Sequence, residues 1–373
     1  MVEEKARGNL AVKRVYYSPD LEGFLWGRRQ IERFSAYSPQ PKLKEELKEE
    51  LYLLSSDPIG EGKGILYLSL FKGPLLKPCP GTKGYICCGY WVGNIVAGCP
   101  MDCSYCVLQV YLNEPFLVLQ LPWEKFFQEV KERANGPLPV RIGTGELSDS
   151  LVLEPLIGFV KEAVSFFRGI KAVLELKTKT DNVDFLQGLP HDGHTVVAWS
   201  LAPQRVIEDF ERGTAPLKGR LKAAKKCLSW GYPLAFHFDP ILHYPGWEED
   251  YRELIEELFS HIDPKGVIWI SMGTFRFPKG LDGIIRRRFP RSWLLTGELF
   301  PASDGKVRYL KPLRVEIYKK VLNWLKEYDH KAFVYLCMER EDVWMATFGF
   351  APKGTKGLKE MLEKHTEVFL RKW

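Results

Sequence analysis

Residues 98–109 read GCPMDCSYCVLQ and carry three cysteines, Cys99, Cys103 and Cys106, separated by three and two residues. Thiolates this close together in one loop can hold an iron–sulfur cluster, and three of them leave one iron of a 4Fe–4S cluster without a protein ligand. A structural zinc site is the alternative, but such sites take four protein ligands, and no nearby histidine or CxxC completes the set. The spacing therefore favours a cluster with one open iron.

Around this loop the chain alternates strand-like and helix-like segments from about Tyr90 onward, which predicts βα units and a parallel sheet. Six such units are too few for a closed eight-stranded barrel, so we expect an α/β fold with a partial (β/α)6, TIM-like barrel. Strands are expected at residues 92–97, 140–143, 172–177, 195–200, 234–239 and 267–272. Helices are expected near residues 123–134, 155–167, 217–230 and 248–261, with shorter ones after Asn182 and at 206–214.

Extensions of α+β type are expected on both sides of the barrel. The predicted divisions are an N-terminal extension at 1–88, the barrel at 89–275, and a basic, hairpin and helical region at 276–373. The first contains a charged amphipathic helix within 41–54 and an apolar strand near 65–71. The last contains a hairpin at 294–310 that turns at Asp304-Gly305, then a helix at 313–327, a strand at 332–336 and two further helical segments.

The composition excludes several classes of protein. The 373 residues are 45% hydrophobic and 27% charged, which is not the composition of a disordered or collagen-like chain. No apolar run reaches the roughly 18–20 residues that span a bilayer, and the start, MVEEKARGNL, is too polar for a secretory signal. We therefore expect a soluble, cytoplasmic protein with no membrane partner. In that reducing compartment the eight cysteines do not predict disulfides.

The net charge of +6 is concentrated in residues 276–320. Twelve Lys and Arg stand there against four acidic residues, a local balance of +8 that leaves the rest of the chain at about −2. Aromatic residues lie among these cations, as they do in surfaces that combine phosphate contacts with base stacking. The stretch predicts a DNA or RNA substrate, with a solvated helix face beside core aromatic residues as the alternative.

Polar residues follow the predicted barrel strands at the point where each strand ends. In folds of this kind the functional site lies at the carboxyl ends of the strands, so we expect these residues to line it, with Asp239 among the candidates for cofactor binding. They are Cys99, Thr144, Gly145, Glu146, Lys177, Lys179, Ser200, Asp239, Thr274 and Arg276.

Longer stretches carry a resemblance to a known family. The three-cysteine loop has the CxxxCxxC motif of the radical S-adenosylmethionine (SAM) superfamily. Together with KTKTDNVDFL, AWSLAPQRVIEDFERGTAPLKGRLKAAKKCLSWGYPLAF and DPILHYPGWEEDY, it resembles the spore photoproduct lyase family, from Gly89 to Tyr251 and less sharply up to VYLCMERED. The resemblance implies a 4Fe–4S cluster that binds SAM at its open iron. It also implies reductive cleavage of SAM, hydrogen abstraction from a substrate, and an electron donor such as flavodoxin or ferredoxin.

The resemblance also assigns residues. Cys99, Cys103 and Cys106 correspond to the cluster ligands, and Tyr105 to the aromatic residue beside the SAM adenine. Lys179 corresponds to a lysine that meets the SAM carboxylate, and Ser200 to a serine that contacts SAM. The loop of Thr144, Gly145 and Glu146 corresponds to one that holds the SAM ammonium group.

Four of these assignments have a structural alternative. Tyr105 could pack against the loop, and Lys179 could be a solvated lysine at a helix start. Ser200 could cap a helix, and Glu146 could be a helix-entry acid favoured by the dipole.

Two positions depart from the family pattern. Glu146 stands where the repair enzyme has its hydrogen-donor cysteine, and Val107 stands where it has a relay tyrosine. We therefore expect the initiating half of the mechanism and not the reversal of a thymine dimer. Four further cysteines are candidates for an auxiliary iron–sulfur or zinc site, or for a relocated thiol donor: Cys79, Cys87, Cys88 and Cys337. The catalytic candidates are Tyr105, Glu146 and Cys337.

Three classes of function follow from these patterns. The first is a radical SAM enzyme that acts on nucleic acid, as a lesion lyase or a base-modifying enzyme. The second is a radical SAM enzyme with a small-molecule, lipid or peptide substrate. The third is a nucleic-acid-binding protein whose cluster is structural or sensory. The open-iron motif together with Lys179 and Ser200 favours an enzyme, because a structural cluster needs neither residue.

Overall fold

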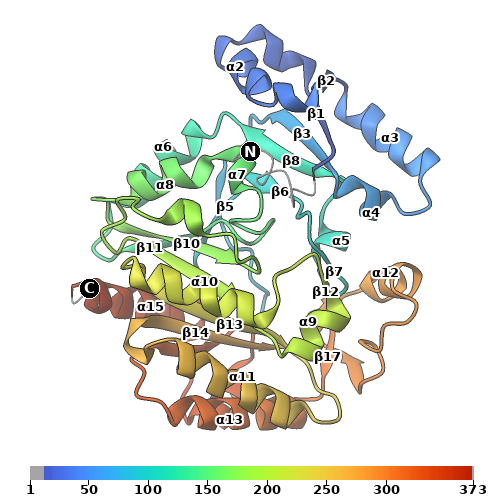
Figure 1. Ribbon diagram of the computed structural model, residues 1–373. Helices are drawn as coiled ribbons and strands as arrows, with labels where there is room; N and C mark the ends of the chain where they lie inside the picture. Colours follow the sequence, from blue (N-terminus) through green and yellow to red (C-terminus); the bar gives the residue numbers. More distant parts are fainter. Residues whose placement is uncertain (1–11, 372–373) are drawn as a thin grey trace.

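The computed structural model describes residues 12–371, and its centre is a curled eight-stranded sheet (Figure 1). Seven strands run parallel and a short antiparallel strand, β4, lies at one edge. Among the described residues the two edge strands do not pair, which confirms the partial barrel. In order across the sheet the strands are β18 (Phe333–Leu336), β14 (Val267–Thr274), β13 (Leu234–Ile241), β11 (Thr195–Ser200), β10 (Ala172–Thr178), β9 (Val140–Gly143), β5 (Trp91–Gly93) and β4 (Leu76–Pro78).

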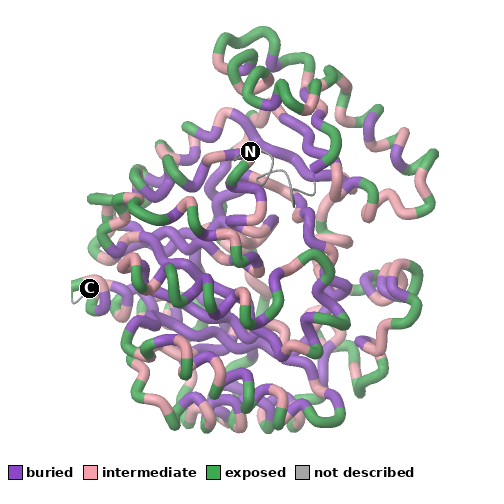
Figure 2. Tube along the Cα trace, in the orientation of Figure 1, coloured by how far each residue is buried: buried purple, intermediate pink, exposed green. Residues whose placement is uncertain are grey.

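The central strands are apolar runs that are buried on both faces, as parallel strands covered by helices must be. Every residue of β11 and β14 is buried, and Figure 2 shows buried chain through the centre of the sheet. The helices between and after the strands are α6 (Glu124–Arg133), α7 (Glu154–Ile157), α8 (Phe159–Phe167), α9 (Gln204–Phe210), α10 (Leu217–Ser229), α11 (Trp247–His261), α13 (Lys311–Lys326), α14 (Glu341–Phe348) and α15 (Gly354–Leu370), with short 3-10 turns at η4 (Asp184–Leu186) and η5 (Pro264–Gly266).

The single strand predicted at residues 92–97 is wrong. The chain pairs in the barrel only as β5, and then leaves it to form β6 (Val96–Ala97), which is antiparallel to β8 (Leu117–Leu121) in a second sheet. Asn94 and Ile95 make the crossing, because the Asn94 N–H donates to the Leu75 carbonyl while the Ile95 carbonyl accepts from Gln120. The three-cysteine loop therefore starts from the second sheet and not from a barrel strand.

The helix predicted at residues 155–167 is two helices. Gly158 lies between α7 and α8 with φ of 73°, a left-handed conformation that glycine adopts without strain and that interrupts a right-handed helix. The strands β13 and β14 also run two residues beyond their predicted ends, so Asp239 lies inside β13.

The second sheet packs above the barrel and belongs mostly to the N-terminal extension. Its order is β2 (Gln40–Pro41), β1 (Arg14–Tyr17), β3 (Ile65–Leu70), β8 and β6. Around it lie η2 (Pro19–Gly23), α2 (Leu25–Arg33), η3 (Ser35–Tyr37), α3 (Lys44–Leu54) and α4 (Pro58–Gly62). The helix and strand predicted for this region are confirmed as α3 and β3. The first ten residues, whose polarity argued against a secretory signal, lie outside the described residues.

The C-terminal hairpin is confirmed and has a third strand. Strand β17 (Lys306–Tyr309) pairs antiparallel with both β16 (Leu299–Pro301) and β15 (Arg276–Pro278), and the turn contains Asp304 and Gly305. Helix α12 (Leu281–Arg288) lies between β15 and β16 in sequence. The predicted divisions at 88 and 275 stay predictions, although β4 and β18 join the barrel sheet from outside them. No helix among residues 12–371 has the length and apolar character needed to cross a membrane.

Candidate radical SAM site

One cavity of about 330 Å³ opens at the carboxyl ends of the barrel strands, where the sequence predicted the site. Seven of the eight cysteines line it, together with residues at or just after the carboxyl ends of β9, β10, β11 and β13. The predicted site residues that this cavity brings together are Cys99, Cys103, Cys106, Tyr105, Gly145, Glu146, Lys177, Lys179, Ser200, Asp239, Arg276, Cys79, Cys87, Cys88 and Cys337. Thr274 does not line it. Thr144 is not among its lining residues. The hydroxyl of Thr144 instead donates to the Ser150 hydroxyl at 2.8 Å beneath the cavity.

The three-cysteine loop is held through its backbone. Lys63 Nζ donates to the carbonyls of Cys99 at 3.1 Å and Met101 at 2.6 Å, and Gln109 Nε2 donates to the carbonyl of Ser104 at 3.1 Å. A short strand within the loop, β7 (Asp102–Cys103), pairs antiparallel with β12 (Glu211–Arg212). These contacts leave the three thiols on the wall of the cavity.

The chemistry of this donor set fits an iron–sulfur cluster. Burial raises the pKa of Cys99 to about 12 and that of Cys103 well above its usual range, so these groups would need the positive charge of a bound metal to ionise. Among residues 12–371, no three His, Cys, Asp or Glu side chains are arranged to hold a single metal ion. Three thiolates that each bind a different iron need not converge on one point, so the loop suits a cluster and not a mononuclear zinc ion.

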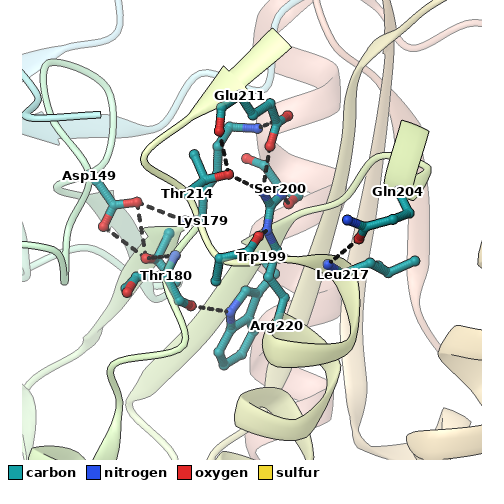
Figure 3. A network of polar contacts seen from close by, with 12 residues as sticks. Asp149, Lys179, Thr180, Trp199, Ser200, Gln204, Glu211, Thr214, Leu217 and Arg220 are labelled. Atoms are coloured by element: carbon teal, nitrogen blue, oxygen red, sulfur yellow. Dashed lines mark hydrogen bonds and ion pairs between the residues drawn. The ribbon is translucent and has the colours of Figure 1, made fainter. Parts of the chain in front are cut away.

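Lys179 lies at the centre of a buried polar network (Figure 3). Its Nζ donates to Glu211 Oε1 at 2.8 Å and to the Tyr105 hydroxyl at 3.1 Å, and the Tyr105 hydroxyl also donates to Glu211. The other carboxylate oxygen of Glu211 accepts from Arg220 at 2.5 Å, and Arg220 reaches the carbonyl of Ser200 at 2.8 Å. Burial alone would raise the pKa of Glu211, but Lys179 and Arg220 outweigh it and lower that pKa to about 2. The network joins three predicted SAM-contacting residues through one carboxylate.

Asp149 orders the loop between β9 and α7. Its carboxylate accepts from the backbone N–H groups of Leu151, Val152 and Lys179, and from the Thr178 hydroxyl at 2.8 Å. Four residues of two different segments are thereby tied to one side chain, which sets the position of Lys179 in the cavity wall.

Glu146 forms an ion pair with Lys177. Burial opposes ionisation of Glu146, but Lys177 outweighs it and lowers the pKa of the carboxyl. The preceding Gly145 lies so close to β10 that a Cβ atom there would stand 2.7 Å from the Cβ of Lys177. A glycine is therefore required for the loop to bring Glu146 beside this strand.

A second hydrogen-bonded chain crosses the floor of the cavity. His237 Nε2 lies 2.6 Å from Glu175 Oε1, and His237 Nδ1 lies 2.6 Å from the Ser271 hydroxyl. The indole of Trp269 also donates to Glu175 at 3.1 Å. Burial would raise the pKa of Glu175, but His237 and Arg141 outweigh it and lower that pKa to about 2.

The remaining cavity cysteines lie on the side of the C-terminal hairpin. Arg276 makes two hydrogen bonds to Asp239, at 3.2 and 3.0 Å, and its NH2 group lies 3.7 Å from Cys337 Sγ. The auxiliary iron–sulfur or zinc site predicted at Cys79, Cys87, Cys88 and Cys337 has no support. Within residues 12–371, no three of these thiols are arranged to hold a single metal ion. They are free thiols in the wall of the cavity.

Sequence reasoning missed Glu175, Glu211, Arg220 and Ser271 as site residues. Glu175 and Ser271 had a recognisable signal, since each is a polar residue inside a strand that is otherwise apolar. Glu211 and Arg220 had none, because they stand in the short strand β12 and in helix α10, whose approach to Lys179 depends on the fold.

The fold and the cavity define a class, the radical SAM type of partial barrel. A family model described as spore photoproduct lyase matches residues 89–312, and the chain belongs to the spore photoproduct lyase family. The chain is 33% identical over 205 residues to spore photoproduct lyase of Bacillus subtilis (strain 168), a match that covers 53% of this chain and 59% of that protein.

Two solved structures share the fold. Spore photoproduct lyase complexed with dinucleoside spore photoproduct has a TM-score of 0.78 and 23% identity, over 88% of this chain and 99% of that one. A double mutant of spore photoproduct lyase with bound AdoMet and dinucleoside spore photoproduct has a TM-score of 0.75 and 24% identity, over 87% of this chain and 98% of that one.

Proposed function

We propose that this protein is a radical SAM enzyme that cleaves SAM reductively at a 4Fe–4S cluster and abstracts a hydrogen atom from a nucleic acid, as a lesion lyase or a base-modifying enzyme. The observation that carries the proposal is the convergence of Cys99, Cys103 and Cys106 with Lys179 and Ser200 on one cavity. Membership of the family supports it, and so does the AdoMet bound in a structure of the same fold.

Cys99, Cys103 and Cys106 would hold the cluster, which together with SAM supplies a 5′-deoxyadenosyl radical when bound. Lys179 would bind the SAM carboxylate, since its ammonium group reaches the cavity and is held in place by Glu211. The carboxylate of Glu146 would accept hydrogen bonds from the SAM ammonium group, and Lys177 would keep that carboxylate ionised. Tyr105 and Ser200 complete this wall of the cavity.

The return of a hydrogen atom, where the reaction needs one, falls to Cys337 in this proposal. Glu146 has no hydrogen atom to donate as a thiol would, and it is paired with Lys177. Cys337 lines the cavity at the end of β18, beside Arg276. A donor that approaches from a different strand favours a reaction other than the reversal of a thymine dimer.

The test is anaerobic reconstitution with iron and sulfide, followed by dithionite and SAM, with 5′-deoxyadenosine measured by mass spectrometry. We expect the wild-type protein to form 5′-deoxyadenosine and Cys99→Ala to fall to background, because the cluster loses a ligand. Cys227→Ala is the matched control, since Cys227 is buried in α10 away from the cavity. A wild-type protein with about four irons per chain that never forms 5′-deoxyadenosine, with or without DNA, would move the function to a structural or sensory cluster.

A further inference from the structure

Two of the three loop cysteines can be reached from a second side. A separate crevice of about 40 Å³ is lined by Cys99 and Cys106 together with Tyr52 from α3 and Lys63. The short helix that follows the loop, α5 (Leu108–Tyr111), supplies another part of its wall. A cluster held by these thiols would therefore lie near the surface here as well as at the cavity.

The surface beside this crevice is apolar. Helix α3 ends in Tyr52, Leu53 and Leu54, whose exposed fractions are 55%, 84% and 81%. Nothing among residues 12–371 covers these side chains. Large apolar residues gathered at an exposed site are typical of a surface that meets another protein.

Unpaired cations stand on the next helix along this side. Arg286 and Arg287 of α12 are exposed, and no carboxylate in the described part of the chain forms an ion pair with either. Their neighbour Arg288 ties α12 to the three-cysteine loop, because it bonds to Asp102 at 2.9 Å and to Gln109. Figure 1 places α3, α4, α5 and α12 along one side of the molecule. The four acidic residues of α3, Glu45, Glu46, Glu49 and Glu50, precede its apolar end, and Glu50 is ion-paired with Lys42.

We propose that this docking face, made of Tyr52, Leu53, Leu54, Arg286 and Arg287, binds a small acidic protein that delivers one electron to the cluster. The proposal rests on the proposed function, in which the cluster gains the electron that the partner loses. Electron transfer slows steeply with distance, so a donor must dock where the cluster lies nearest the surface. An apolar patch with cations beside it suits a weak, transient complex with an acidic protein.

A nucleic acid is the other polyanion that these arginines could bind. The docking face favours a protein, because exposed leucines give no contact to a phosphate backbone, whereas a protein partner can bury them. The substrate cavity also has its own cation, Lys306, on the hairpin. Substitutions at Arg286 and Arg287 should therefore affect binding of the electron donor, whereas a substitution at Lys306 should affect binding of a nucleic acid.

The experiment measures how fast the cluster is reduced, by anaerobic stopped-flow absorbance, with reduced flavodoxin or with dithionite as the donor. We expect R286E/R287E to slow reduction by flavodoxin about tenfold at low salt, because charge attraction raises the association rate. L53S/L54S should slow it as well. Dithionite is small and needs no docking face, so its rate should stay unchanged in both variants. K356E/K364E, the same charge change on α15, is the matched control.

Each other outcome has one meaning. If flavodoxin reduces the cluster of both variants as fast as that of wild type, the proposed docking face is wrong, and the proposed function is unaffected. Loss of DNA binding in R286E/R287E, with the flavodoxin rate unchanged, would overturn it in favour of a nucleic-acid surface. A wild-type protein that dithionite cannot reduce would instead overturn the proposed function, and the docking face with it.

Discussion

At the scale of single residues, Glu211 is the carboxylate on which the cavity wall around Lys179 depends. It accepts from Tyr105, Lys179 and Arg220, and both Glu211 and Arg220 are buried. Removing one member of a buried ion pair leaves the other charge without a partner in a medium of low dielectric. The same side chain therefore serves both the stability of the fold and the position of Lys179.

We predict that Glu211→Gln lowers the free energy of unfolding at pH 7 by about 3 kcal/mol, since Arg220 is left unpaired. The pKa of Glu211 is about 2 in the folded protein and about 4.5 when unfolded, so its contribution is complete above pH 4.5 and is lost as the pH falls toward 2. The variant should therefore show less loss of stability on acidification than wild type. Urea unfolding across that range measures both effects.

Glu208→Gln is the control, because Glu208 is exposed one turn earlier on α9. A Glu211→Gln protein as stable as the Glu208→Gln protein at pH 7 would contradict this role.

At the scale of elements, the break between α7 and α8 has its own titratable group. Glu154 begins α7, and its carboxyl accepts from the N–H of Val160 at 2.8 Å, in the first turn of α8. Burial raises the pKa of Glu154 to about 8, above its value near 4.5 in the unfolded chain. The folded protein thus holds a proton that the unfolded chain releases between these two values.

We predict that this group makes wild type less stable as the pH rises from 4.5 through 8, by a few kcal/mol in total. Glu154→Gln, which keeps an acceptor for Val160 and cannot ionise, should have a higher melting temperature than wild type at pH 9 and no advantage at pH 4. Glu124→Gln, an exposed glutamate at the start of α6, is the comparison. An unchanged melting temperature at pH 9 would show that Glu154 ionises in the fold without cost.

At the scale of the whole molecule, the fold redistributes the basic charge of residues 276–320. Among residues 12–371, six of the twelve cations counted in the sequence form ion pairs, and several of their partners lie far away along the chain. The pairs are Arg276 with Asp239, Arg288 with Asp57 and Asp102, Arg308 with Asp304, Arg314 with Glu339, Lys311 with Asp342, and Lys320 with Glu248 and Glu316. Lys306 is different, because it lines the cavity and bonds to the Thr82 hydroxyl at 2.8 Å, and no carboxylate within residues 12–371 pairs with it. Lys306 is thus placed to meet a phosphate of the proposed substrate.

We predict that the protein binds a single-stranded DNA oligonucleotide with an affinity that falls steeply as salt is raised. Lys306→Ala should weaken binding about tenfold through loss of a phosphate contact, and Lys319→Ala, an exposed lysine of α13, should have little effect. Fluorescence anisotropy under anaerobic conditions measures these affinities. No binding at about 50 mM salt would count against a nucleic-acid substrate.

Much of this protein follows from sequence alone. The barrel strands and the hairpin follow from apolar runs and turn residues, because burial on both faces demands continuous apolar sequence. The three-cysteine loop could be found because its spacing is local. The division of residues 92–97 between two sheets could not be found from the sequence, since it depends on which neighbouring strand each residue pairs with.

The tertiary structure alone decided which polar groups meet. Glu211 and Arg220 come to Lys179, and Glu339 to Arg314, across separations in sequence that no local pattern encodes. A count of charges along the chain therefore overstated the free cations in residues 276–320. Spacing and periodicity determine which elements form, whereas the partners of a charge are set by packing, because Coulomb energy depends on distance in space and not along the chain.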